Sequence, residues 1–231
     1  MKFLKSTILG GLALLLAAPA QAVVINFQDM ADGPGPIGTF VTGEAGFVVL
    51  NLLAAYGLDI SITVLDGDGT AGGVAGAGYA YLDEGNAGLG ACTALDMNSE
   101  CAPSSDDNVS GGTDASETLV FTFNEMITLS NIIFNDNHDG KTLDNETVLI
   151  DGAQHTFLAA DNIAGDKKDY LYSVGTTFMA GDTITVGYGG NAASKFYLTS
   201  MTATNNVSAT GSTALLFLGL GGLFLARRKL K

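Results

Sequence analysis

Residues 117–135 alternate between apolar and polar side chains, and this pattern constrains the fold more than any other feature of the chain. Leu119, Phe121 and Phe123 fall on one face of an extended chain, and the pattern resumes at Ile127 after a short polar turn. A period of two residues places every second side chain in a core when the chain is a strand. The sequence therefore predicts two strands here, joined as a hairpin.

Other segments have a similar strand-like composition, and turn-forming pairs separate several of them. The predicted strands are 23–27, 59–65, 79–83, 147–150, 155–159, 170–174, 183–188 and 196–202, with turns at 151–152, 164–166 and 181–182 and loops at 30–38 and 66–78. Residues 47–56 are apolar without a clear period, so both strand and helix remain open there. Short strands at this spacing predict an all-β fold, an antiparallel β-sandwich of the jelly-roll kind.

The amino end has the three parts of a secretory signal peptide. Lys2 and Lys5 form a basic region, residues 8–18 are apolar, and Ala20 and Ala22 form an A-x-A cleavage site. Residues 1–22 are therefore predicted to be removed on export.

The carboxyl end has the pattern of a membrane-spanning segment that stops at a basic cluster. An apolar run over residues 213–226 is followed at once by Arg227, Arg228 and Lys229. The run alone is short, but counting back to Val207 gives the roughly 20 residues that a spanning helix needs, and the cations favour a cytoplasmic end. The predicted organisation is a signal peptide (1–22), an exported domain (23–204) and a linker, membrane helix and basic tail (205–231).

The domain between these ends is strongly acidic. It contains all 24 Asp and Glu residues but only four of the ten Lys and Arg residues, which gives a net charge near −20. Such a field repels nucleic acid and attracts cations, including calcium. A solvated acidic surface explains the same composition without any bound metal.

The two cysteines, Cys92 and Cys101, are predicted to form a disulfide, because exported proteins occupy oxidising compartments. The bridge closes a loop of about ten residues and contributes roughly 2–3 kcal/mol in the chain-entropy model. The enclosed loop is polar, and we expect it to be exposed.

One segment has the oxygen spacing of a calcium loop. In NDNHDGKTLDNE, the candidate ligands are Asn135, Asn137, Asp139 and Glu146. Asparagine replaces the usual first aspartate and strands flank the segment, so a polar loop between strands is the alternative. The acidic pairs at 66–68, 83–84 and 106–107 are further candidates for calcium, the one cofactor that the sequence favours. None of these clusters is singled out by its sequence.

The succession of signal peptide, exported domain, small-polar linker, apolar helix and Arg/Lys cluster resembles that of PEP-CTERM proteins. These are exported Gram-negative proteins that an exosortase sorts and cleaves, usually in bacteria that make exopolysaccharide. The family signature begins Val-Pro-Glu-Pro, and the matching positions here are Val207, Ser208, Ala209 and Thr210. The valine, the apolar helix and the basic cluster fit, whereas both prolines and the glutamate are absent. A Gly-Gly type of tail that a rhomboid-like protease cuts is the alternative.

A second resemblance covers residues 88–117. The segments Gly88-Leu89-Gly90-Ala91-Cys92 and Asp106-Asp107-Asn108-Val109, together with Cys101 and Glu117, resemble extracellular β-sandwich domains that often precede PEP-CTERM tails. This resemblance implies a fold and no ligand. The partners that the two resemblances imply are an exosortase-like sorting enzyme, the inner membrane before processing, and extracellular polysaccharide.

Catalytic motifs are missing from the sequence. There is no G-x-S-x-G, no H-E-x-x-H and no C-x-x-C, and the histidines are His138 and His155 alone. We therefore expect a non-enzymatic cell-surface or matrix protein. The alternatives are a calcium-dependent carbohydrate-binding module and a secreted hydrolase with a carboxylate pair.

Overall fold

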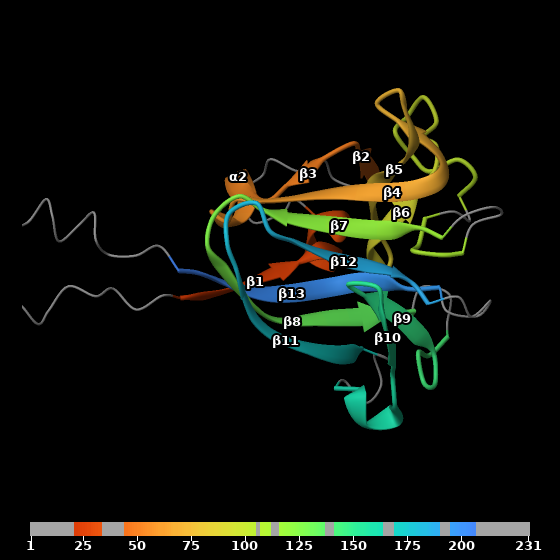
Figure 1. Cartoon of the computed structure of the whole chain (residues 1–231). Coiled ribbons are helices and arrows are strands. Elements are labelled where there is room, and N and C mark those ends of the chain that lie inside the picture. The colour runs from red at the N-terminus through yellow and green to blue at the C-terminus, as the bar shows by residue number, and fades with distance from the viewer. Residues whose placement is uncertain are drawn as a thin grey trace, which may run out of the picture. The chain divides into compact units, whose positions relative to one another are not determined.

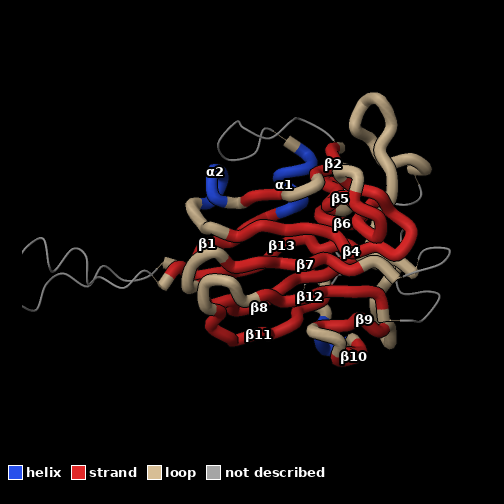
Figure 2. Tube along the Cα trace, turned by 45° about the horizontal axis from the view of Figure 1, so that its top comes forward, coloured by secondary structure: helices blue, strands red, loops and turns tan. Residues whose placement is uncertain are grey.

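The computed structural model describes residues 21–33, 44–104, 107–111, 116–136, 141–163, 169–189 and 195–206, and for residues 66–71 the backbone alone. Ala22–Asn205 forms one compact unit. Its strands are β1 (Ala22–Asn26), β2 (Ala45–Phe47), β3 (Leu50–Asn51), β4 (Ile60–Ala71), β5 (Val74–Asp83), β6 (Gly88–Cys92), β7 (Thr118–Phe123), β8 (Ile127–Asn135), β9 (Thr147–Ile150), β10 (Ala153–Thr156), β11 (Tyr170–Phe178), β12 (Thr183–Tyr188) and β13 (Tyr197–Asn205). The helices are α1 (Phe27–Asp32), α2 (Leu53–Tyr56) and a 3-10 turn, Ala159–Asp161. Strands dominate the unit (Figure 2).

All the strands belong to one antiparallel sheet. Its order is β10-β9-β12-β7-β4-β5-β6-β13-β8-β11, with β1 beside β13, β2 beside β5 and β3 beside β4. The predicted all-β antiparallel class is confirmed. No helix in the described ranges is long and apolar enough to cross a bilayer.

The sheet curls so that β7 and β12 lie across a core from β8 and β11 (Figure 1). Phe123 on β7 stacks on Phe178 at the end of β11 with ring centroids 4.3 Å apart. Phe134 on β8 contacts Phe157, which follows β10, at 5.1 Å. Aromatic rings from both ends of the strand order thus meet in a single core.

The alternation that opened the sequence analysis is seen in the burial of β7 and β8. Leu119, Phe121 and Phe123 are buried on β7, and Ile127 and Leu129 are buried on β8. The intervening side chains on β7 are half-buried. Strand period therefore identified the core faces of both strands correctly.

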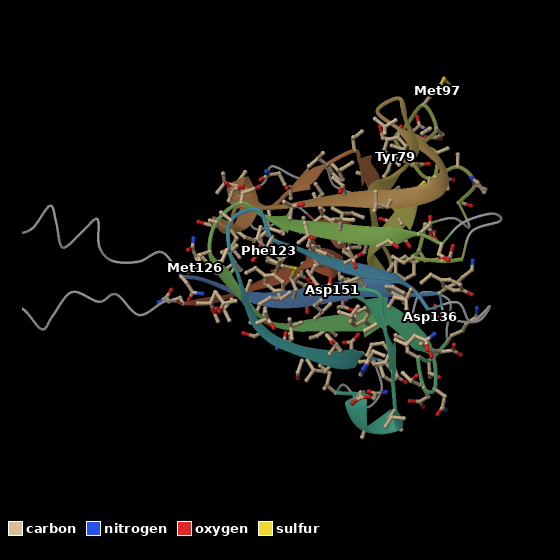
Figure 3. All side chains as sticks on the ribbon, viewed as in Figure 1. Tyr79, Met97, Phe123, Met126, Asp136 and Asp151 are labelled. Atoms are coloured by element: carbon tan, nitrogen blue, oxygen red, sulfur yellow. A yellow bond between two sulfur atoms is a disulfide. The ribbon has the colours of Figure 1, made fainter. Side chains whose placement is uncertain are left out.

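The predicted hairpin between these strands is wrong. β7 pairs with β4 and β12, whereas β8 pairs with β13 and β11. The connection near Phe123 and Met126 (Figure 3) carries the chain from one side of the core to the other. Its backbone is satisfied by other segments, because Phe123 N donates to the Asp182 carbonyl (3.0 Å) and Asn124 N donates to the Asp59 carbonyl (2.8 Å).

The loop predicted at residues 66–78 is also wrong, because β4 continues to Ala71 and β5 starts at Val74. Gly72 and Gly73 join them with φ of 57° and 81°, in the left-handed region that glycine adopts without steric cost. Small residues gave no alternating pattern to reveal these strands. The open segment 47–56 contains both alternatives, the end of β2, then β3 and α2.

Candidate functional site

Three neighbouring strands present polar groups on the face of the sheet opposite the core. Leu82 on β5 is opposite Leu89 on β6, and Leu89 is opposite Leu198 on β13. All three leucines belong to the core cluster. Because side chains alternate along a strand, the adjoining Tyr81, Asp83, Gly88, Gly90 and Tyr197 face the other way.

The middle strand, β6, has glycine at residues 88 and 90, which face outward, so no side chain rises above its backbone there. Gly90 pairs with Tyr81, and a Cβ at Gly90 would collide with the backbone carbonyl of Asp107. Residues 107–111, which we call the strap, therefore lie directly on β6. The close approach requires glycine, and it explains why Asp107 and Asn108 come so near the sheet.

Under the strap, polar groups gather around the phenol of Tyr197. The Tyr197 hydroxyl donates to Asp107 Oδ1 (2.8 Å), and Asn108 Nδ2 donates to the same oxygen (3.2 Å). Tyr197 is fully buried and Asp83 is 1% exposed. Burial, followed by the negative charges of Asp107 and Asp83, raises the pKa of Tyr197 well above its ordinary value. Carboxylates from β5 and from the strap thus act on one phenol oxygen.

Two contacts hold the strap in place. Val109 pairs with Phe196, with N–H to carbonyl distances of 2.9 and 3.2 Å. Ser110 donates its backbone N–H (2.7 Å) and its hydroxyl (3.1 Å) to Oε2 of the fully buried Glu117. A buried carboxylate that accepts two such bonds fixes the backbone next to it.

The predicted disulfide is confirmed, and it anchors the segment that leads to the strap. Cys92 and Cys101 are bonded with Cα atoms 5.9 Å apart. They pack with Tyr81 in a small second cluster on the outer face, and the Tyr81 hydroxyl donates to Glu44 Oε2 (2.7 Å). The loop between the cysteines is exposed, as expected, with Met97 at its tip (Figure 3).

The described members of the predicted calcium loop have different neighbours. Asn135 is 1% exposed, and its Nδ2 donates to the Ala87 carbonyl (2.9 Å) and to Thr199 Oγ1 (2.6 Å). Burial raises the pKa of Tyr188 on β12, and the negative charge of Glu146 raises it further. Asp136, which follows Asn135, lies at the opposite end of β8 from Met126 (Figure 3).

Ala22, the last residue of the predicted signal peptide, is the first residue of β1. The other predicted site residues lie outside the described ranges: Ala20, Asn137, Asp139, Val207, Ser208, Ala209, Thr210, Arg227, Arg228 and Lys229.

In the ranges that the structure describes, no three His, Cys, Asp or Glu side chains form a group suited to a metal. The hydrogen-bonded groups under the strap are the Asp107 carboxylate, the Asn108 amide and the Tyr197 phenol.

Sequence reasoning found parts of this cluster without joining them. The acidic pairs 83–84 and 106–107 were separate candidates, and Tyr197, whose hydroxyl donates to Asp107, lies 90 residues further along the chain than Asp107. The usable local signal was Gly-x-Gly at residues 88–90, which marks a backbone that another segment approaches closely. Nothing local predicted the position of Tyr197.

Comparisons with known proteins give no relatives for this chain. No family model, no curated protein and no solved structure matches it.

Proposed function

We propose that this chain is an exported, non-enzymatic cell-surface or extracellular-matrix protein that a C-terminal membrane signal delivers. In this proposal the curled antiparallel sheet of the domain is classified more specifically, as a β-sandwich of the jelly-roll kind. The partners are an exosortase-like sorting enzyme, the inner membrane before cleavage and the polysaccharide of the cell exterior.

The pairing of the first and last strands carries the proposal. β1 is antiparallel to β13, with Ala22 opposite Thr204 and Asn26 opposite Ser200. The predicted cleavage points, after Ala22 and near Val207, therefore adjoin the same end of one strand pair. Cleavage after Ala22 removes only the end pair, Ala22 with Thr204, and cleavage near Val207 lies beyond β13, so the pairs from Val23 to Asn26 remain and we expect a domain trimmed at both ends to keep its fold.

Two further features support an exported domain. The Cys92–Cys101 disulfide forms and persists in oxidising compartments. The acidic domain is suited to solubility and repels nucleic acid. Neither feature identifies a ligand.

The test is expression of the full chain in a Gram-negative host with its sorting enzyme, followed by mass spectrometry of the surface protein. We expect the mature chain to begin near Val23 and to end between Val207 and Gly211. A matched variant, Arg227→Ala/Arg228→Ala/Lys229→Ala, should reach the periplasm and accumulate with an uncut tail. Recovery of an intact Lys231 from surface protein would contradict the proposal.

The alternatives predict other results for the same purified protein. A calcium-dependent carbohydrate-binding module should be retained on host polysaccharide with calcium and released by a chelator. A hydrolase should turn over a glycan substrate and lose that turnover when one carboxylate is replaced. Retention that does not depend on calcium, without turnover, is the result expected of the proposed matrix protein.

A further inference from the structure

We propose that the outer face of β13, β8 and β11 binds an uncharged polysaccharide. The inference rests on the proposed function, in which the polysaccharide of the cell exterior is a partner, and it adds the binding surface and the charge class of the polymer. We call this surface the hydroxyl face and define it by six residues: Thr128, Asn131, Ser173, Thr177, Thr202 and Thr204.

Strand pairing places these six side chains on one surface. β13 pairs with β1 and β8, and β8 pairs with β11, so the four strands are neighbours in the sheet (Figure 1). One row across the sheet is Thr204, Thr128 and Thr177, and the next row is Thr202, Asn131 and Ser173. Leu129 and Ala203, which are paired between the rows, belong to the core cluster, so both rows face away from the core.

The hydroxyl face is open to solvent. Ser173 and Thr177, on β11, are exposed, and the other four residues are half-buried between neighbouring strands. Neighbouring strands lie about 4.8 Å apart, so β1, β13, β8 and β11 together extend roughly 14 Å across the sheet. A surface of this size can contact a short stretch of an extended sugar chain.

This part of the domain has no charged side chain. β1, β8, β11 and β13 contain no Asp, Glu, Lys, Arg or His, although the domain contains 24 acidic residues. The polar groups of the hydroxyl face are five hydroxyls and one amide, which donate and accept hydrogen bonds without a charge. An acidic polymer would find no cation here, and the net charge of the domain, near −20, would repel it.

The composition of the face also separates a polysaccharide from a protein partner. Protein interfaces are enriched in aromatic residues, Met and Arg, and the hydroxyl face has none of these. A second copy of the chain would bring a second net charge near −20, and like charges repel. The hydroxyl groups of a sugar polymer can exchange hydrogen bonds with Thr, Ser and Asn side chains. An uncharged polysaccharide therefore matches the chemistry of the face.

The outer face of β4, β7 and β12 is also rich in threonine and provides a comparison within the same molecule. Its threonines include Thr63 on β4 and Thr122 on β7. On β12, however, Asp151 Oδ1 accepts from the Thr185 backbone N–H (2.8 Å) and from its hydroxyl (3.4 Å). A carboxylate therefore lies at that face, whereas the four strands of the hydroxyl face contain none.

The experiment uses the full chain, with its disulfide formed, in micelles of a polyoxyethylene detergent that contains no sugar. The probe is host polysaccharide, separated by anion exchange into an uncharged and an acidic fraction. Native gel electrophoresis through each fraction, with a chelator present, measures binding as a loss of mobility. We expect the uncharged fraction to slow the protein and the acidic fraction to leave its mobility unchanged. Slowing by the acidic fraction alone, or by neither, would overturn the inference.

Variants that remove hydroxyls test the location. Valine has the shape of threonine and suits a strand, so Thr202→Val/Thr204→Val should keep the melting temperature of the parent. We expect it to weaken binding to the uncharged fraction by at least about five-fold, the factor that one net hydrogen bond contributes. The matched control is Thr63→Val/Thr122→Val, which removes two half-buried hydroxyls from the other face and should bind as the parent does.

A second variant on β11 addresses the exposed edge of the hydroxyl face. Ser173→Ala/Thr177→Val should also weaken binding by at least about five-fold. If the uncharged fraction slows the parent and both hydroxyl-face variants equally, the hydroxyl face is not the site, although the proposed function stands. Weaker binding by the control alone would place the site on the face of β4 and β7 and would equally contradict the inference. The proposed function itself fails on different results, namely uncut ends of the chain or no retention on unfractionated polysaccharide.

Discussion

The contact between Phe123 and Phe178 gives a test of how the sheet curls. Phe123 is fully buried on β7, Phe178 is 7% exposed at the end of β11, and their rings stack with 4.3 Å between centroids. The two strands belong to opposite sides of the core, and β7 pairs with neither β8 nor β11 among the registered pairs. The two rings can therefore stack only if the sheet curls so that β7 faces the end of β11 across the core.

The magnitude follows from burial and from stacking. Replacing a buried Phe by Ala costs about 3–5 kcal/mol of unfolding free energy, since transfer and cavity effects add. Stacked aromatic pairs contribute about 0.5–1.5 kcal/mol beyond the area that they bury. We therefore expect Phe123→Ala and Phe178→Ala each to be strongly destabilising, and the double variant to cost about 1 kcal/mol less than the sum of the single costs.

Urea unfolding followed by far-ultraviolet circular dichroism measures these costs, because the chain has no tryptophan for fluorescence. Met179→Ala is the matched control, since Met179 adjoins Phe178 and is 56% exposed. It should change the unfolding free energy by less than about 0.5 kcal/mol. Additive single costs, within about 0.3 kcal/mol, would show that the rings do not interact and would refute the curl as described.

Three further predictions concern the disulfide, the buried phenol and a turn. Replacing both Cys92 and Cys101 by Ala should lower the unfolding free energy by about 2–3 kcal/mol, and a reducing agent should then have no added effect in a urea titration. Native Tyr197 keeps its proton above the unfolded pKa of about 10, so its contribution to the unfolding free energy should be constant below that pH and fall above it by up to about 1.4 kcal/mol per pH unit. Tyr197→Phe should remove that share of the slope in alkaline unfolding experiments, and an unchanged slope would exclude Tyr197 as its source. Asp151 and Gly152 have φ of 49° and 75° in the β9–β10 turn, so Gly152→Ala should cost about 1 kcal/mol in thermal melts, whereas Asp151→Asn should cost less because asparagine tolerates this φ and keeps an oxygen for the Thr185 backbone N–H.

The predictions that held depend on local chemistry. Alternation identified the buried faces of β7 and β8, and the pair at residues 151–152 marked the turn between β9 and β10. Side-chain period and turn preference are properties of a few adjacent residues, so one sequence reveals them. The strands at residues 66–78 were missed for the same reason, because glycine and alanine carry no alternating signal.

The sequence by itself determined the strand-rich class, the buried faces of β7 and β8 and the pairing of the two cysteines. It also led to the expectation of processed ends. Tertiary structure alone decided which strands are neighbours, and so placed β7 and β8 on opposite sides of the core. It also brought Asp107 and Tyr197, which are 90 residues apart in the chain, into hydrogen-bond contact under the strap. Strand neighbours are chosen by the burial of side chains that lie far apart in the chain, and no local pattern records that choice.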